Sequence, residues 1–170
     1  MKKSAALLLV FLMLLLCSCT KEKGSESNAG VSSFFNSQKA SFSVSCGEFE
    51  GKGEIEYSSS TLNITVTYPV SLKGLELTVT QNDITVSHNG LSVTKETHAF
   101  PDSFFAREIY SVLKSAEQNL SVEKTSEGKA ASGTCPAGEF RLNLDSLGRI
   151  KDISIPAKQL FISFEYTKDS

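Results

Sequence analysis

The chain has 170 residues, with 17 Lys or Arg against 19 Asp or Glu and a formal net charge of −2. This length allows one domain with a substantial core. The slight acidic balance argues against a nucleic-acid partner or a polybasic membrane surface, both of which call for a basic patch.

The first residues indicate an export signal. Met1-Lys2-Lys3 is a short cationic region, and the stretch from Ala5 to Leu16 that follows contains no charge. This arrangement is typical of a secretory signal peptide. The apolar run is shorter than the roughly 20 residues that a membrane-spanning helix needs, so we expect it to be removed rather than to cross the membrane.

The end of the apolar run, L16-C17-S18-C19, resembles the lipidation signal of bacterial lipoproteins. In that resemblance Ser18 is the small residue before the cleavage site, and Cys19 becomes the acylated N-terminus with chains such as palmitate. Two or more acyl chains give stable anchoring where one does not. The resemblance therefore implies a signal peptide over residues 1–18 and a protein anchored to the outer face of the cell membrane, or to an outer membrane if the host has one. A plain signal peptide with incidental cysteines is the alternative.

Two further cysteines, Cys46 and Cys135, remain after the signal and the lipidated residue are set aside. Exported compartments permit disulfide bonds, so we predict a bridge between these two residues. The alternative is a pair of buried free thiols, since an unpaired cysteine behaves as a small hydrophobic residue.

Residues 19–33 combine the lipidated cysteine with a stretch rich in Ser, Gly and Glu that has no hydrophobic period. Such a composition predicts a flexible tether. The folded domain is then expected over residues 34–170.

From residue 40 onward, apolar and polar residues alternate with a period of two, which is typical of half-buried strands. Asn89-Gly90 between two such segments is a strong hairpin signal. Alternation, in place of continuous apolar runs, favours an antiparallel sheet with one covered face. The alternating segments are 41–46, 49–57, 62–68, 75–79, 84–86, 91–93, 140–144, 153–155 and 160–166.

The alternation breaks once, over residues 103–119. Pro101 precedes two candidate N-cap residues, Asp102 and Ser103. The residues that follow predict one amphipathic helix of about four turns. Its apolar face would hold Phe105, Ile109, Val112, Leu113, Ala116 and Leu120, and its polar face Arg107, Glu108, Ser111, Lys114 and Glu117.

Together these elements predict a mainly β domain of the α+β class. A sheet of about nine strands must curl, because strand twist accumulates across it. One helix cannot cover such a sheet laid flat, but it can pack inside a curled one. We therefore expect an incomplete β-barrel, formed by a curled antiparallel sheet, with the amphipathic helix on the concave face.

The order of these elements resembles the fold of the periplasmic lipoprotein carrier and its outer-membrane receptor, an incomplete barrel lidded by helices. The matching hairpins are GKGEIEYSSSTLNITVTY at 51–68, LELTVTQNDITVSHNGLSV at 75–93 and FRLNLDSLGRIKDISI at 140–155. The resemblance covers about residues 34–166. It implies an interior that holds the acyl chains of a lipid or lipoprotein.

Eight apolar residues are expected to face the space between sheet and helix. If the helix closes tightly on the sheet they are simply core, and if the barrel stays partly open they line a pocket for a lipid or acyl chain. They are Leu62, Ile64, Val66, Leu77, Val79, Phe105, Ile109 and Leu113.

Catalytic and metal-binding patterns are not recognisable in the sequence. There is no Gly-x-Ser-x-Gly elbow and no phosphate-binding glycine loop, and neither His88 nor His98 has a ligand at a suitable spacing. We therefore expect a non-enzymatic protein without cofactor or metal that binds a hydrophobic ligand or a lipoprotein in the cell envelope. The alternative is an accessory protein that binds an envelope protein through its sheet surface, with no small ligand.

Overall fold

The computed structural model describes residues 38–58, 60–118, 120–125 and 128–166. The predicted signal peptide, the lipidated Cys19 and the tether all lie outside the described residues. So do residues 34–37 and 167–170 of the expected domain. The predictions made for these segments remain predictions.

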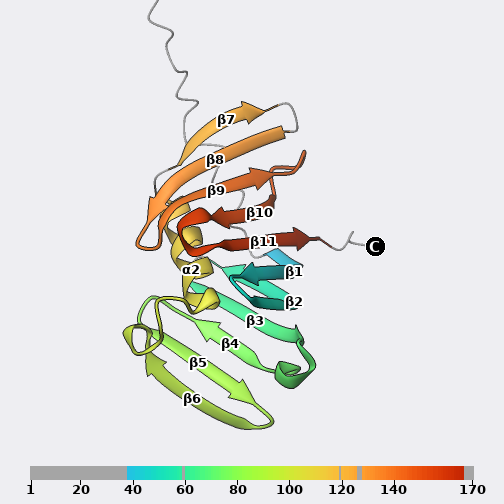
Figure 1. Ribbon diagram of the computed structural model, residues 1–170, viewed down its shortest axis with the longest axis vertical. Coiled ribbons are helices and arrows are strands. Elements are labelled where there is room, and N and C mark those ends of the chain that lie inside the picture. The colour runs from blue at the N-terminus through green and yellow to red at the C-terminus, as the bar shows by residue number, and fades with distance from the viewer. Residues whose placement is uncertain (1–37, 59, 119, 126–127, 167–170) are drawn as a thin grey trace, which may run out of the picture.

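The described chain forms an antiparallel sheet of eleven strands with one α-helix (Figure 1). The helix, α2, spans Phe105–Ala116, and three short 3₁₀ helices lie in connections: η3 (Val70–Leu72), η4 (Thr97–Ala99) and η5 (Pro156–Lys158). The strands are β1 (Gln38–Cys46), β2 (Phe49–Ser58), β3 (Thr61–Tyr68), β4 (Glu76–Val79), β5 (Asp83–His88), β6 (Leu91–Glu96), β7 (Ser121–Thr125), β8 (Gly128–Cys135), β9 (Gly138–Leu144), β10 (Ile150–Ile155) and β11 (Leu160–Glu165).

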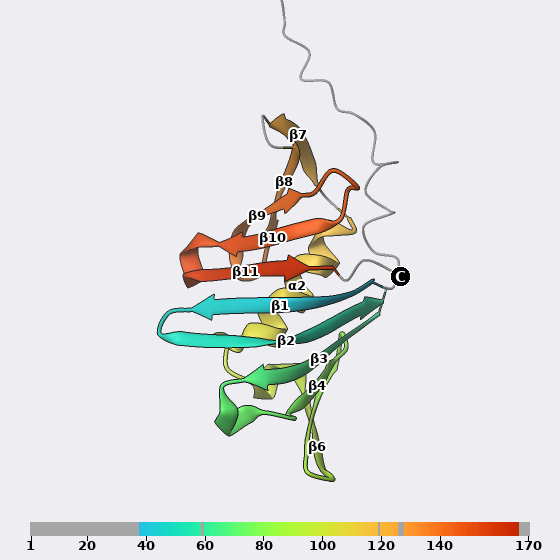
Figure 2. The same cartoon turned by 90° about the vertical axis from the view of Figure 1, so that its right-hand side faces the viewer.

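The strand order explains where α2 must lie. It runs β6-β5-β4-β3-β2-β1-β11-β10-β9-β8-β7, so β1 and β11 pair in the middle and β6 and β7 are the two edges. The segment that joins β6 to β7 must therefore cross the whole sheet. α2 belongs to that segment and packs on the concave side of the curled sheet (Figures 1 and 2). The predicted mainly β architecture, a curled antiparallel sheet with a helix on its concave face, is confirmed.

The predicted number of about nine strands was wrong, because β7 and β8 were missed. β8 has the sequence GKAASGTC, whose small residues show no apolar alternation, and β7 is five residues with only one apolar side chain, Val122. Pairing with the alternating β9 fixes β8 in the sheet, with Ala131 opposite Leu142, and β8 then pairs with β7. Tertiary pairing thus outweighs weak local propensity here.

The hairpin turn predicted at Asn89-Gly90 is confirmed, and so is a turn within the hairpin expected over residues 140–155. Asn89 and Gly90 both have positive φ values, 51° and 80°, as a tight two-residue hairpin turn requires. In the turn between β9 and β10, one carboxylate oxygen of Asp145 accepts hydrogen bonds from the backbone N–H groups of Leu147 (2.9 Å) and Arg149 (2.8 Å).

The start of α2 differs from the prediction. The N-cap residue is Phe104, which makes no capping side-chain hydrogen bond. The expected cap Asp102 instead accepts a hydrogen bond from Arg107 at 2.8 Å. Packing explains this difference, because Phe104 stacks on Phe100 with ring centroids 5.2 Å apart. Aromatic burial therefore sets where the helix begins.

The polar face of α2 also needs one correction. Glu108 was expected on the exposed side, but only 6% of its surface is accessible. Its carboxylate lies 3.8 Å from the Lys158 ammonium group in η5, the connection between β10 and β11. A buried carboxylate requires such a partner, and η5 supplies one that the helical period alone could not reveal.

The structure lacks the predicted bridge between Cys46 and Cys135, and both residues are free thiols. Cys46 ends β1 and Cys135 ends β8, with β11, β10 and β9 between them. At about 4.8 Å per strand, four spacings separate the two strands by roughly 19 Å along the sheet. A disulfide needs Cα atoms within about 7 Å. The Cys46 thiol instead donates to the Lys158 carbonyl at 3.8 Å.

Candidate functional site: the interior beneath α2

The eight residues predicted for the concave interior come from three elements. β3 contributes Leu62, Ile64 and Val66, β4 contributes Leu77 and Val79, and α2 contributes Phe105, Ile109 and Leu113. All except Phe105 are no more than 4% exposed, and Phe105 is partly buried. The structure thus places all eight in or against one apolar core.

The opposite wall of this interior was not included in the sequence prediction. It is formed by buried side chains of β8 to β11: Ala131, Phe140, Leu142, Leu144, Ile150, Ile153, Ile155, Leu160 and Ile162. Most of these residues alternate visibly with polar neighbours, so their burial was detectable. The sequence could not reveal that the segment after β6 runs back across the sheet, so that α2 packs against both of its halves.

One helix covers only part of the concave face. α2 has 12 residues and is therefore about 18 Å long and about 10 Å wide. Eleven strands span roughly 48 Å along the curve of the sheet. The described part of the sheet also does not close, since its end strands are β6 and β7. The apolar face must therefore continue beyond the helix.

The continuation lies on β5 and β6. Val86 pairs with the buried Leu77 on one side and with Val93 on the other, so all three side chains share the concave face. Exposure rises outward along this row, because Leu77 is 1% exposed whereas Val93 is 56% exposed. Leu91, on the same face of β6, is 77% exposed. We name Val86, Leu91 and Val93 the apolar rim.

The N-terminal end of α2 is held by aromatic rings. Phe105 stacks on Phe49 of β2 with centroids 5.5 Å apart, and it lies 6.5 Å from Phe42 of β1. Phe104 continues the cluster at 5.7 Å from Phe105. This end of the helix is therefore fixed to the sheet by side chains that could equally pack on an apolar ligand.

The C-terminal end of α2 is held by polar groups. The Tyr57 hydroxyl of β2 donates to Glu117 at 2.7 Å, and the Lys114 ammonium group donates to the other Glu117 oxygen at 2.7 Å. The Tyr110 hydroxyl donates to the Ser60 carbonyl at 3.4 Å. Burial, followed by the hydrogen bond to Glu117, raises the pKa of Tyr57 far above its ordinary value, so the hydroxyl remains a donor.

Glu108 is the buried charge of the site. Burial raises the pKa of its carboxyl above the ordinary value, while the positive charges of Lys158 and Arg107 oppose that shift. Lys158 keeps about a third of its side chain exposed. The pair thus joins the middle of α2 to the β10–β11 connection at some cost in desolvation.

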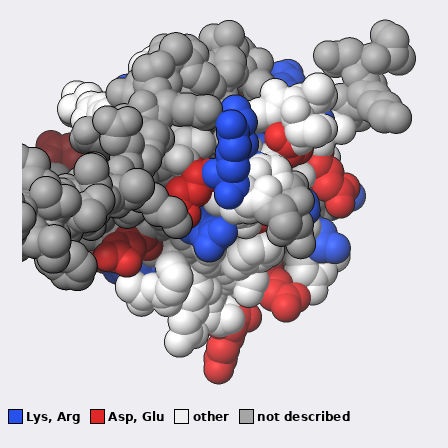
Figure 3. Space-filling model, turned by 90° about the horizontal axis from the view of Figure 1, so that it is seen from above, with Lys and Arg blue, Asp and Glu red and all other residues white. Residues whose placement is uncertain are grey.

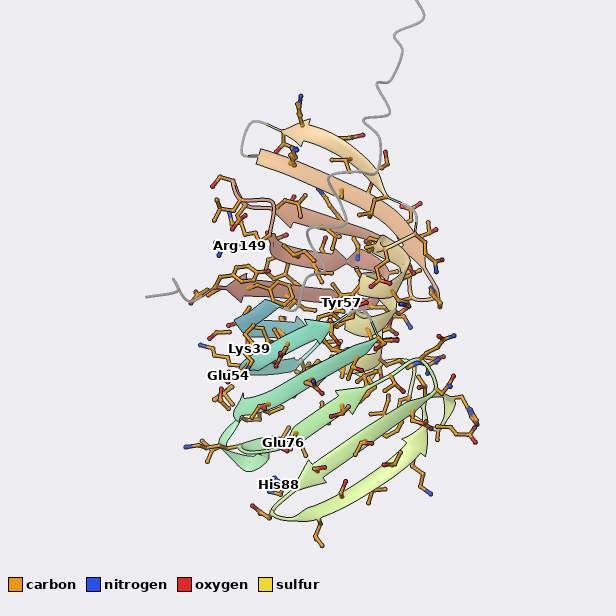
Figure 4. The ribbon with its side chains drawn as sticks, turned by 180° about the vertical axis from the view of Figure 1, so that it is seen from behind. Lys39, Glu54, Tyr57, Glu76, His88 and Arg149 are labelled. Atoms are coloured by element: carbon orange, nitrogen blue, oxygen red, sulfur yellow. The ribbon has the colours of Figure 1, made fainter. Side chains whose placement is uncertain are left out.

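The outer, convex face carries two polar hollows. The first, of about 220 Å³, includes Lys39, Glu54 and Glu56 on β1 and β2, and Figure 4 shows the side chains of Lys39 and Glu54 near one another there. The second, of about 260 Å³, is lined by residues of β7 to β10. Its lining residues are Thr125, Lys129, Arg141, Asn143, Leu144, Lys151 and Asp152.

Within the described ranges, no three His, Cys, Asp or Glu side chains are grouped so that they could hold a metal ion. The helices of this part of the chain are also too short or too polar to span a membrane.

Comparison with known proteins gives similarities at the level of solved structures. No family model and no curated protein matches the sequence. An uncharacterized conserved protein from Thermus thermophilus matches with a TM-score of 0.45 and 14% identity, covering 83% of this chain and 85% of that one.

Two further structures have a TM-score of 0.37. A LolA superfamily protein from Nitrosomonas europaea is 7% identical, with 83% of this chain and 91% of that one covered. The Mycobacterium tuberculosis lipoprotein LppX is 12% identical, with 76% of this chain and 86% of that one covered. These likenesses are too distant to support an argument about function, which therefore rests on the geometry of this chain.

Proposed function

We propose that the protein is an exported, lipid-anchored, non-enzymatic binding protein that holds an apolar chain, such as an acyl chain of a lipid or lipoprotein, between the sheet and α2. The observation that carries the proposal is the mismatch between the sheet and its cover. The concave face of an unclosed sheet of eleven described strands is covered only in part by a helix of 12 residues.

The apolar rim is the entrance in this proposal. Val86 and Val93 continue the buried row that begins at Leu77, so a chain bound on the rim would already contact the side chains that lead inward. Exposed apolar surface of this kind is commonly a binding site. An acyl chain gains about 0.8 kcal/mol for each CH₂ that it buries, which favours its entry along the row.

α2 acts as the lid. Its side chains fill the interior when no ligand is bound, and a ligand would take the place of Phe105, Ile109 and Leu113 against the sheet. Pockets for apolar ligands are mostly lined by apolar and aromatic side chains with a few polar groups. The interior beneath α2 has this composition, with Glu108 and Tyr57 as its polar members.

The test is uptake of a fluorescent fatty acid by a version of the chain that begins at residue 20, followed by native mass spectrometry. We expect saturable binding of about one ligand per chain. Val93→Asp should weaken binding about tenfold, because it places a charge on the rim. The matched control is Val70→Asp, since Val70 is 80% exposed and belongs to η3, in the connection between β3 and β4, and not to the rim strands β5 and β6. Absence of uptake, or equal losses in both variants, would contradict the proposal.

A second function, docking of an extended segment of an envelope protein along β6, is favoured by the exposure and regular pairing of this edge strand. All six residues of β6 are exposed, and β6 pairs regularly with β5 without a bulge. Edge strands left in this state can accept another strand. Both edge strands carry exposed charges, Lys95 and Glu96 at the end of β6 and Glu123 and Lys124 in β7, and basic and acidic side chains are interspersed at the β7 end (Figure 3). The uncharged part of β6, residues 91–94, is therefore the docking segment in this proposal.

The two functions separate in one experiment. Thr94→Pro removes a backbone donor from β6 and should abolish strand docking, yet leave fatty-acid uptake within about twofold. A membrane pulldown that returns a partner with the unmodified chain and not with Thr94→Pro would favour docking. Uptake without any such partner favours the apolar-ligand function.

A further inference from the structure

We infer that the second hollow of the convex face, which we name the basic hollow, binds a phosphate group, independently of the apolar ligand proposed for the opposite face. The hollow is lined by Lys129 of β8, Arg141 of β9 and Lys151 of β10, with Asn143 and Asp152 beside them. Its volume of about 260 Å³ is the space of about nine water molecules, which admits a phosphate group with part of its hydration.

The positively charged side chains of the basic hollow do not take part in ion pairs within the described part of the fold. Lys129, Arg141 and Lys151 are exposed and form no ion pair with any residue that the structure describes. The other arginines, Arg107 and Arg149, are both paired with aspartates. Arg141 and Lys151 therefore bring two uncompensated positive charges to the outer face of a chain whose overall charge is negative, whereas Lys129 pairs with Leu144 and shares its inner face. This arrangement on the outer face selects for an anion.

A β-bulge brings one of these cations to the hollow. Ile150 pairs with Leu144, but Asp152 pairs with Asn143, so Lys151 is an extra residue in β10 without a partner in β9. Such bulges redirect side chains and are frequent beside binding sites. The bulge sets Lys151 next to Asp152, in the same hollow as Arg141 from the neighbouring strand.

The floor of the hollow has a neutral donor. The Asn143 amide donates one hydrogen to Asp152 at 2.7 Å, and Asp152 is 9% exposed. An amide nitrogen carries two hydrogens, so the second can reach a ligand oxygen. Arg141 can pair with two phosphate oxygens at once, whereas each lysine acts as a point charge. Among the described residues of the outer face that line the hollow, the two positive charges of Arg141 and Lys151 outnumber the negative charge of Asp152, which favours an anion over a cation.

The experiment uses two probes on the chain that begins at residue 20, which contains every described strand and α2. Inorganic phosphate is titrated while backbone amides are followed by NMR, and vesicles of phosphatidylglycerol with phosphatidylcholine are compared with vesicles of phosphatidylcholine alone. Amide shifts at Arg141 and Lys151 without a vesicle preference identify free phosphate as the ligand. Binding to phosphatidylglycerol vesicles that phosphate competes away identifies a lipid headgroup.

Three variants test the basic hollow itself. Arg141→Gln should weaken binding about tenfold, which is about 1.4 kcal/mol. The triple variant Lys129→Gln, Arg141→Gln, Lys151→Gln should abolish it. The matched control replaces three exposed lysines elsewhere, Lys52, Lys73 and Lys95, by Gln and should retain binding within about twofold.

Asp152→Asn should strengthen binding at the basic hollow instead of weakening it. A variant that fails to fold could not produce such a gain in affinity. The Asp152→Asn substitution keeps the shape of the side chain and removes the one negative charge among the described residues that line the basic hollow, so affinity should rise about fivefold. Absence of binding with both probes, or equal loss in the two triple variants, would overturn the inference. So would vesicle binding that the triple variant of the hollow leaves intact.

Discussion

The two ends of α2 are both attached to β2, but by different forces. At the N-terminal end, Phe105 is packed between aromatic rings of β1 and β2. At the C-terminal end, Tyr57 of β2 and Lys114 share the carboxylate of Glu117. The first attachment depends on water being excluded, whereas the second consists of hydrogen bonds that water can replace.

This difference predicts how the lid responds to an apolar ligand. A ligand that enters the interior offers Phe105 a new apolar contact, so the N-terminal end can be released at little cost. An apolar ligand cannot replace the hydrogen bonds that Glu117 accepts, so the C-terminal end should stay attached. α2 would then swing about its polar end rather than lift as a whole. The following substitutions test this difference between the two ends, in decreasing order of the change that we expect.

Phe105→Ala should have the largest effect, because it removes the aromatic contacts of the N-terminal end. We expect a loss of about 3 kcal/mol in the free energy of unfolding, measured by urea denaturation. The matched control is Phe161→Ala, since Phe161 lies on the outer face and is 49% exposed. A loss of under about 1 kcal/mol is expected there. Equal losses would mean that the ring cluster does not hold the helix.

Tyr57→Phe removes the main hydrogen bond of the C-terminal end and keeps the ring that faces Tyr110. The expected loss is about 1.5 kcal/mol, as for a hydrogen bond to a charged acceptor. Amide hydrogen exchange should quicken at residues 113–117 and remain unchanged at residues 105–108. Tyr68→Phe, at a 47% exposed position, is the control and should cost little. Uniform exchange along α2 would contradict a hinge at this end.

Glu108 should make the attachment of α2 dependent on pH. Its carboxyl pKa is raised in the folded state, mainly by burial, so the folded chain binds a proton more tightly than the unfolded chain. Stability from this group is complete below the unfolded pKa near 4.5 and is lost as pH rises through the folded pKa.

We expect Glu108→Gln to remove this decline in unfolding free energy as the pH rises above about 4.5. Lys158→Met should steepen it, because Lys158 opposes the shift. Urea denaturation at acidic, intermediate and neutral pH measures both variants. Parallel pH profiles in the unmodified chain and Glu108→Gln would show that the carboxyl is not responsible.

Lys114→Gln should have the smallest effect. It removes an ion pair to Glu117 that spans one turn of the helix and is partly exposed, for which a loss of about 0.4 kcal/mol is typical. Combined with Tyr57→Phe, the losses should not simply add, since both groups share Glu117. A double-mutant cycle measures the coupling, and strict additivity would argue against a single polar attachment.

The elements with a clear period were predictable from the sequence. Alternation located the nine strands in which apolar and polar residues follow one another, and Asn89-Gly90 located a hairpin. β8 was not predictable, since its Ala and Gly residues become strand-like only when they pair with β9. The burial of Glu108 was equally hidden, because its partner Lys158 lies far along the chain, in a connection that shows no pattern.

The candidate interior was only half predictable. Residues of β3, β4 and α2 were found because their apolar positions fall at regular spacing. The apolar rim was present in the sequence as Leu91 and Val93, but only the pairing of β5 with β6 places them next to Val86. The bulge at Lys151 has no sequence signal at all, so the basic hollow follows from the structure alone.

The pairing of β1 with β11 has a consequence for how the sheet could be cut and rejoined. Ser41 lies opposite Glu165, so the chain enters and leaves the sheet at neighbouring points, midway between the edges. A short linker could join these points, and new ends could be opened in the exposed turn at Asn89 and Gly90. Such a circular permutant keeps every pairing of the sheet. The arrangement of the strands in the sheet would then not depend on the order in which they are synthesised.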